Sequence, residues 1–254
     1  VDAIDAVATH RGTLLFGVPT MWGRIAASDR VGALRSLRLG VSGSAPLDPQ
    51  LHAAIATETG QHLIERYGMT ETVMLTSNPY VGERRAGTVG MALPGVDLRL
   101  AEGTDEIEVR GPNVFSDYWQ RPDATTESFD GSWFKTGDVG AFDDDGYLRI
   151  VGRRKELIIS GGYNVYPREV EDVLRRHPAV VDAAVVGLPD PEWGERVVAA
   201  VEGPASPEDV DAIASLARTE LAPYKRPKQI VVVDALPRNA LGKVVKAEVR
   251  ALLG

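Results

Sequence analysis

Apolar and polar positions follow two different rhythms along the first part of the chain, and each rhythm predicts a different kind of structure. Across residues 1–78, short apolar runs such as 13–18 (TLLFGV) and 37–43 (LRLGVSG) are each followed by a turn and a run of helical period. This alternation of strand and helix predicts an α/β arrangement. From about 82 to 152, short strands separated by Gly, Pro and Asp turns predict a small antiparallel sheet or β-barrel-like subdomain.

The remaining residues have the pattern of a compact α+β unit. A hairpin-like run at 156–165 (ELIISGGYNV) precedes a helix that begins after Pro167, where proline suits the first helical turn. Two strands, a helix from Ser206, a further strand and a terminal helix follow. The pattern therefore predicts one domain at 1–152 and a second domain at 153–254.

The composition removes several classes of function. Of the 254 residues, 44% are hydrophobic and 25% are charged, and the net charge of −8 would repel a polyanion, so we expect no nucleic-acid partner. The absence of cysteine excludes a disulfide framework, a thiolate zinc site and a cysteine nucleophile. No apolar run approaches the roughly 18 residues needed to cross a bilayer, so we expect a cytoplasmic protein without a membrane partner.

Four motifs combine glycine with charged or aromatic residues where a fold alone would not require them. They are SGSAPL at 42–47, ERYGMTET at 65–72, FKTGDVG with VGRRKELIISGGYNVYP at 134–140 and 151–167, and LPRNALGK at 236–243. In this order and spacing they resemble the adenylate-forming superfamily of acyl-CoA synthetases, nonribosomal-peptide adenylation domains and firefly-type luciferases. The resemblance implies the C-terminal part of a large AMP-binding α/β domain, then a small mobile α+β lid with a hinge near 153–155.

The YGMTE motif offers the chemistry of a nucleotide site. Tyr67 can stack on a purine, Gly68 lets the backbone approach, Thr70 offers a hydroxyl to a phosphate, and the Glu71 carboxylate can hold Mg²⁺. The family uses the corresponding residues in this way. Taken alone, the motif is equally consistent with a strand that ends in a turn capped by a threonine.

Two further parts of the large domain are implied by the family pattern. In the family, the loop that corresponds to SGSAPL at 42–47 lines the adenine and acyl pocket. Taken without the other motifs, this loop suits a simple strand-to-helix turn. Nucleotide contacts are then expected from Gly43, Ser44, Ala45, Arg66 and Met69. Asp138 lies between two glycines and can accept hydrogen bonds from both hydroxyls of a ribose, although an Asp-Gly turn explains it equally well.

The second domain contributes four residues through the resemblance. Arg153 is expected to contact ribose or phosphate, and Lys155 takes the hinge position, although both belong to a basic triplet that is ordinarily only solvated. Lys243 matches the catalytic lysine, a cation that neutralises charge as carboxylate attacks the α-phosphate of ATP. Gly162 is expected to border the coenzyme A pantetheine tunnel, although a double glycine also suits a tight turn.

The acid substrate is indicated less directly. Several segments look more like malonyl-CoA or methylmalonyl-CoA synthetases than long-chain or aryl-CoA ligases. A dicarboxylate needs a cation for its second carboxylate, for which Arg24 is the first candidate and Arg84 the second. Ser42 or Ser44 can hydrogen-bond the acid. Met74 and its neighbours 72–75 are expected to line the acyl pocket or to be core.

The resulting hypothesis is a two-step ligase that uses Mg²⁺-ATP. A small carboxylic acid becomes acyl-AMP with the help of Lys243, and rotation about Lys155 then presents Gly162 so that coenzyme A displaces AMP. One alternative is an adenylation domain that loads a carrier-protein thiol. Another is a non-catalytic fragment that binds AMP or complements a separate half.

The family pattern also includes a part that these residues do not contain. A Ser/Thr/Gly-rich loop ending in lysine, which cradles the β- and γ-phosphates in the N-terminal half of the family, is absent from the 254 residues. Residues 1–10 have the pattern of the middle of an amphipathic helix, without a capping cluster before it. We therefore expect a fragment whose partner is the N-terminal half of the same protein, and which does not adenylate alone.

Overall fold

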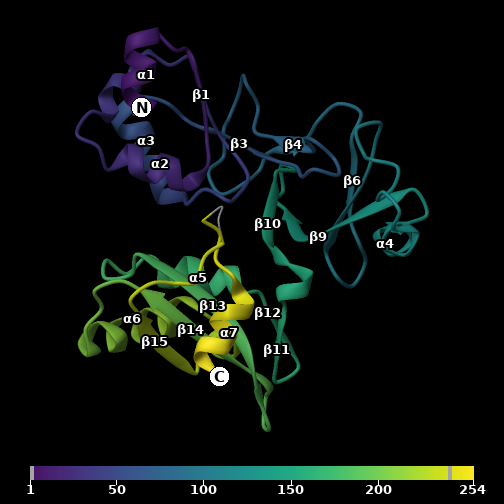
Figure 1. The fold of residues 1–254 in the computed structure, drawn as a ribbon, viewed down its shortest axis with the longest axis vertical. Coiled ribbons are helices and arrows are strands. Elements are labelled where there is room, and N and C mark those ends of the chain that lie inside the picture. Colours follow the sequence, from purple (N-terminus) through teal and green to yellow (C-terminus); the bar gives the residue numbers. More distant parts are fainter. Residues whose placement is uncertain (1–2, 240–241) are drawn as a thin grey trace. The chain divides into compact units, whose positions relative to one another are not determined.

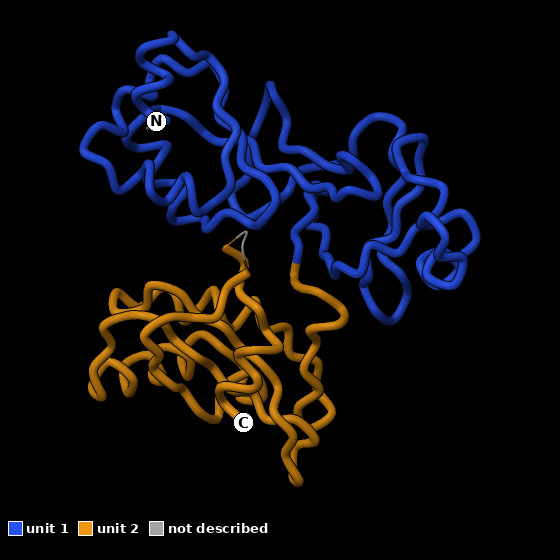
Figure 2. The backbone as a smooth tube through the Cα atoms, in the orientation of Figure 1, with its two compact units in different colours: residues 1–150 blue, residues 151–254 orange. Residues whose placement is uncertain are grey.

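The computed structural model describes residues 3–239 and 242–254, and the chain divides into two compact units. Unit 1 covers Val1–Ile150 and unit 2 covers Val151–Gly254 (Figure 2). Each unit has its own sheets, helices and hydrophobic cores. Mixed α/β structure with separate sheets confirms the predicted fold class. Within the described residues, no helix has the length and apolar character that a membrane span requires.

The first half of unit 1 is a sheet that begins parallel and ends antiparallel. Its strands occur in the order β1 (Leu14–Gly17), β2 (Leu39–Ser42), β3 (Ile64–Tyr67), β4 (Thr76–Ser77) and β5 (Met91–Ala92). The first three strands pair in parallel and the last two pairings are antiparallel. The first two of these strands form within the runs that the sequence pattern predicted.

Three helices and a 3-10 turn accompany this sheet (Figure 1). They are α1 (Ala3–His10), α2 (Pro19–Ala26), η1 (Val31–Ser36) and α3 (Pro49–Thr59). Trp22 of α2 is buried among Leu34, Ile55 and Leu63, and its indole N–H donates to the carbonyl of Val41 at 3.2 Å. This contact fixes α2 against the second strand. At the sheet edge, β1 alternates half-buried side chains with exposed ones.

The second half of unit 1 is a five-stranded sheet in the region predicted to be β-rich. Its strands are β6 (Asp97–Leu100), β7 (Glu106–Arg110), β8 (Phe129–Asp130), β9 (Trp133–Phe142) and β10 (Leu148–Arg153). Helix α4 (Pro122–Ser128) directly precedes β8. The order is β10-β9-β7-β6, with β8 paired to β9. The register between β7 and β9 shifts between Glu106 and Glu108, so β9 carries a bulge there.

Unit 2 is a sheet with helices on both faces. Its elements are η2 (Arg154–Glu156), β11 (Ile158–Ser160), β12 (Tyr163–Val165), α5 (Pro167–Leu174), β13 (Asp182–Asp190), β14 (Gly194–Glu202), α6 (Pro207–Glu220), η3 (Pro223–Lys225), β15 (Gln229–Val233) and α7 (Lys246–Leu253). The order is β12-β11-β14-β13, with β15 parallel to β14. Helix α5 begins at Pro167 and α6 follows Ser206, close to the starts that the sequence predicted. Ser206 also caps α6 in a capping box, a feature that was not predicted from the sequence.

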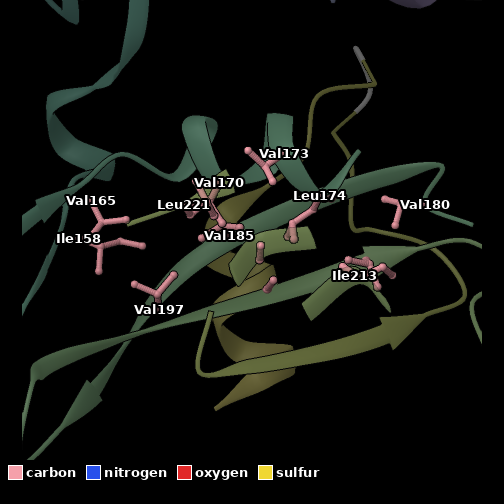
Figure 3. Packing of buried hydrophobic residues seen from close by; sticks show 14 residues of the cluster. Ile158, Val165, Val170, Val173, Leu174, Val180, Val185, Val197, Ile213 and Leu221 are labelled. Atoms are coloured by element: carbon pink, nitrogen blue, oxygen red, sulfur yellow. The ribbon is translucent and has the colours of Figure 1, made fainter. Parts of the chain in front are cut away.

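Alternation along β13 and β14 explains why both faces of this sheet are apolar. Ala183 and Val185 face a core that α5 and α6 supply with Leu174 and Ile213 (Figure 3). The intervening residues face a second core that contains Val249 of α7. Successive side chains on a strand point to opposite faces, so a nearly continuous run of alanine and valine is buried on both.

Gly90 provides a test of the packing between β4 and the start of β5 in the first sheet of unit 1. Its φ is +78°, and an added Cβ would lie 2.0 Å from the carbonyl carbon and oxygen of Ser77. Gly90→Ala should therefore lower the free energy of unfolding by about 2–4 kcal/mol, as read from urea unfolding. Gly95→Ala is the matched control, because φ is +84° there but nothing lies within 4 Å. The control should cost only about 1–2 kcal/mol; equal losses would show that contact with Ser77 is not limiting.

Candidate functional site

The YGMTE motif forms the end of β3 and a tight loop that folds back on it. The N–H of Leu75 donates to the carbonyl of Tyr67 at 2.9 Å. The side-chain amide of Asn113 donates to the carbonyl oxygens of Thr72 at 2.7 Å and Met74 at 3.1 Å. A Cβ on Gly68 would lie 2.1 Å from the carbonyl oxygen of Val73 in this loop. The glycine is thus required by the loop itself, and Asn113 is a stabilising residue that the motif did not reveal.

Tyr67 and Asp138, two of the predicted site residues, are in direct contact. The phenol of Tyr67 donates a hydrogen bond of 2.7 Å to Oδ2 of Asp138, across 71 positions of sequence. Asp138 lies in the bulged part of β9, next to Gly137 with a φ of +75°, whose N–H donates to Glu106. Only 5% of Asp138 is exposed. The bulge therefore directs a buried carboxylate towards the ring of the motif.

Glu71 is held from the side of the loop that precedes α4. The phenol of Tyr118 donates to Oε1 of Glu71 at 2.9 Å, and the N–H of Phe115 donates to its carbonyl at 2.8 Å. Burial, followed by the hydrogen bond to Glu71, raises the pKa of Tyr118 above its ordinary value. The Tyr118 phenol therefore keeps its proton near neutral pH and remains a donor to Glu71. Sequence reasoning did not predict this residue. Thr70, next to Glu71, is exposed.

The loop after β2 combines a strained residue with open space. Ser44 has a φ of +69°, and both Ser44 and Ala45 are exposed. A Cβ on Gly43 would lie no closer than 3.7 Å to the carbonyl oxygen of Arg66, an ordinary contact. Gly43 is thus not required by packing inside unit 1. Arg66 lies with its guanidinium 5.0 Å from the centre of the Phe16 ring.

Ser42 ends β2 with a buried hydroxyl. Its side chain is 1% exposed, and Oγ has no hydrogen-bond partner in the part of the chain that the structure describes. Nearby, the buried carboxylate of Glu65 accepts the N–H of Leu47 and of Gly87, each at 3.2 Å. Glu65 therefore joins the loop after β2 to the loop before β5, while Ser42 remains available as a hydrogen-bonding group.

The two arginines proposed for the acid have different surroundings. Arg24 is exposed on α2. Arg84 donates to the carbonyl oxygens of His62 at 2.6 Å, Tyr80 at 2.9 Å and Pro79 at 3.3 Å. A guanidinium engaged with three main-chain carbonyls holds a loop together, so Arg24 is the better candidate of the two.

The residues after Glu71 differ in exposure. Thr72 and Leu75 are fully buried, whereas Val73 is 71% exposed at a φ of +57°. Met74 is half-buried. The segment is therefore partly core, and Val73 and Met74 are the members with access to a ligand.

Unit 2 holds the remaining predicted residues. Arg153 and Lys155 are exposed around η2. Gly161 and Gly162 form the two-residue turn between β11 and β12, with φ values of +59° and +81°. Both glycines thus serve the tight turn that the sequence allowed. They differ in packing: a Cβ on Gly161 would lie 2.8 Å from the Trp193 ring, whereas one on Gly162 would meet nothing within 4 Å.

Lys243 is exposed and lies between Arg238 and Val244, which form an isolated antiparallel β-bridge. It lies three residues before α7, and its N–H donates to Oδ1 of Asn239 at 3.0 Å. The nearby residues 240–241 lie outside the described part of the chain. The exposed side chain thus belongs to a residue whose own main chain is hydrogen-bonded to Asn239.

Two parts of the chain match the models of known protein families. Residues 1–119 match the model of the AMP-binding enzyme family, and residues 169–243 match the model of the AMP-binding enzyme C-terminal domain. The two matches include the YGMTE loop and Lys243 and occur in the order of the two units. The chain belongs to the AMP-binding enzymes, the adenylate-forming family that its motifs resemble.

Three relatives show the range of proteins to which it is similar. The malonate–CoA ligase of Arabidopsis thaliana is 40% identical over an alignment of 270 positions, gaps included, which covers 95% of this chain and 44% of that protein. A feruloyl-CoA synthase from an Amycolatopsis species is 43% identical over an alignment of 267 positions, which covers 99% of this chain and 54% of that protein. The crystal structure of ATP-bound MatB from Rhodopseudomonas palustris has a TM-score of 0.90 at 41% identity, covering 98% of this chain and 52% of that one. The chain spans about half the length of these relatives.

The contact between Tyr67 and Asp138 can be tested by nucleotide binding. If Asp138 accepts charge-assisted hydrogen bonds from a ribose, as expected from the sequence, Asp138→Ala should weaken AMP binding by about tenfold or more. Tyr67→Phe keeps the ring and removes one donor, so its loss should be smaller. Calorimetric titration with AMP measures both, with Tyr147→Phe as a control whose hydroxyl donates instead to the carbonyl of Glu83. Unchanged affinity in Asp138→Ala would remove Asp138 from the site.

Proposed function

We propose that this chain is the C-terminal half of an ATP-dependent acid–thiol ligase that forms AMP. The observation that carries the proposal is the hydrogen bond between Tyr67 and Asp138, which combines an aromatic ring and a buried carboxylate beside the Glu71 loop. An adenosine needs a flat surface for its base and an acceptor for its ribose hydroxyls, and these two residues offer both. Family membership supports the same assignment.

Glu71 and Thr70 are suited to the phosphate end of the nucleotide. Glu71 offers a carboxylate of which one oxygen accepts from Tyr118, and the second oxygen suits a hard cation. Among the described residues, no group of three or more acidic, histidine or cysteine side chains could hold a metal. Mg²⁺ is ordinarily bound through one or two carboxylates together with substrate phosphates, so a single glutamate fits this role. When bound, the ion would neutralise phosphate charge.

The proposed reaction has two steps. An oxygen of the acid attacks the α-phosphorus of ATP and pyrophosphate leaves, giving acyl-AMP; the sulfur of coenzyme A then attacks the acyl carbon and AMP leaves, giving the thioester. The ammonium of Lys243 would stabilise negative charge in the first step. Gly162 would border the thiol in the second step, which agrees with the open space where its Cβ would lie. Lys155 would be the hinge between the two arrangements.

For the acid we propose malonate or methylmalonate. Similarity to a malonate–CoA ligase supports this choice, while the equally similar feruloyl-CoA synthase shows that identity alone supports only a carboxylic acid. Exposed Arg24 would pair with the second carboxylate, and the buried hydroxyl of Ser42 would donate a hydrogen bond. Met74 would contact the methyl branch.

Lys243 gives the first test of the two-step scheme. In the full-length protein, Lys243→Ala should lower ATP–pyrophosphate exchange by at least about 100-fold, because a cation that acts on the transition state is lost. Thioester formation from supplied acyl-AMP should stay near the wild-type rate. Lys228→Ala, at a cation that lies 4.0 Å from the centre of the Trp193 ring, is a control for loss of positive charge in unit 2. Equal loss of both steps in Lys243→Ala would contradict the division of roles.

The acid is tested by exchange with a panel of malonate, methylmalonate, acetate, benzoate and long-chain acids. Malonate or methylmalonate should give the highest kcat/KM, and Arg24→Gln should lower that value by about tenfold or more while leaving acetate nearly unchanged. Acetate has no second carboxylate to lose an ion pair, which makes it the internal control. Exchange with benzoate or long-chain acids but none with malonate would refute the substrate and leave the ligase assignment intact.

A further inference from the structure

The segment that carries Lys243 is folded back on itself by main-chain hydrogen bonds. The N–H of Val245 donates to the carbonyl of Pro237 at 2.9 Å, and the N–H of Asn239 donates to the carbonyl of Lys243 at 2.9 Å. In return, the N–H of Lys243 donates to Oδ1 of Asn239 at 3.0 Å. The main chain of Lys243 is therefore held at both its donor and its acceptor, while its side chain is exposed.

Arg238 attaches this segment to the sheet of unit 2. Its Nη2 donates to Asp182 at 2.6 Å and to Glu202 at 3.3 Å, while its Nη1 donates to the carbonyl of Gly242 at 3.2 Å. Asp182 begins β13, Glu202 ends β14, and the two are direct partners in the register of these strands. One guanidinium thus joins two carboxylates at the end of the sheet to the residue that precedes Lys243.

The two carboxylates have other partners that fix their positions. Arg175 of α5 donates from Nε to Asp182 at 2.8 Å and from Nη2 to the carbonyl of Ala183 at 3.1 Å. Glu202 accepts the N–H of Leu236 at 2.9 Å. Burial raises the pKa of Asp182, but the guanidinium groups of Arg175 and Arg238 outweigh burial and hold that pKa below its ordinary value. The Asp182 carboxylate therefore stays ionised and available to both guanidinium groups near neutral pH.

The far end of the segment is fixed by a second cation. Lys246, the first residue of α7, donates to the buried carboxylate of Glu171 on α5 and to the carbonyl of Val185 at 2.9 Å. Glu171 also accepts the N–H of Val185 at 2.8 Å. The segment with Lys243 is thus attached to α5 and the sheet on both sides of the lysine.

We propose that Arg238 is a positioning residue for Lys243, acting by joining the main chain at Gly242 to the carboxylates of Asp182 and Glu202. This role rests on the proposed function of Lys243 in the first step. Because Gly242 is attached to the sheet in this way, the main chain of Lys243 keeps its place on unit 2 and need not be ordered anew at each turnover. Groups held in place before the reaction lose less entropy in reaching the transition state.

The test compares both half-reactions in the full-length protein. Arg238→Met should lower kcat for ATP–pyrophosphate exchange by about tenfold or more with little change in KM for ATP, and leave thioester formation from acyl-AMP within about twofold. Arg238→Lys keeps the charge but not the planar fork, so it should recover part of the rate. Arg176→Met removes an exposed ion pair with Glu220 and should match wild type in both reactions.

Amide hydrogen exchange supplies a readout that does not depend on catalysis. In Arg238→Met, the amides of Asn239, Gly242, Lys243 and Val245 should exchange faster while those of β13 and β14 keep their protection. Unchanged exchange at these four amides, or equal losses in both half-reactions, would overturn the positioning role. If Lys243→Ala itself left pyrophosphate exchange intact, the proposed function would fail, and hydrogen exchange would still decide whether Arg238 holds the segment.

Discussion

The hydrogen bond between Tyr67 and Asp138 joins the two sheets of unit 1 at the candidate site. Tyr67 ends a strand of the first sheet, and Asp138 lies in the bulge of a long strand of the second sheet. Without the bulge the alternation of β9 would be uninterrupted, and Gly137 supplies the left-handed backbone that it needs. The position of the carboxylate thus depends on a local break in regular pairing. Main-chain hydrogen bonds between Leu148 of β10 and the residues Val89 and Gly90 join the two sheets at a second place.

The two units solve the problem of holding a functional group in different ways. In unit 1 the groups lie on strand ends and tight loops whose conformations are set by main-chain contacts, as Gly68 and Asn113 show. In unit 2 the sheet is covered on both faces, and Lys243, the proposed catalytic residue, lies beyond the last strand at the margin of the sheet. Charged side chains then attach that segment to the core, a task that buried valine and alanine cannot perform.

The sequence predicted much of this structure because its strongest signals are local. The strand–helix rhythm before residue 78, the proline at the start of α5 and the start of α6 at Ser206 each depend on a few neighbouring residues. The contacts of Tyr118 with Glu71 and of Arg238 with Asp182 depend on strand register and loop paths, which no local pattern encodes. Arg84 shows the same limit, because its three carbonyl partners become visible only in the fold. The roles of the site residues came from family resemblance and remain predictions.

The first strand of unit 1 has a consequence for work with this chain in isolation. Leu14 and Phe16 on β1 are 42% and 52% exposed, and β1 lies at the edge of its sheet. An edge strand with exposed apolar side chains presents unpaired main-chain N–H and C=O groups together with a hydrophobic surface, and a second molecule can bind to both. Solubility and self-association of the isolated chain should therefore depend on whether this edge is covered.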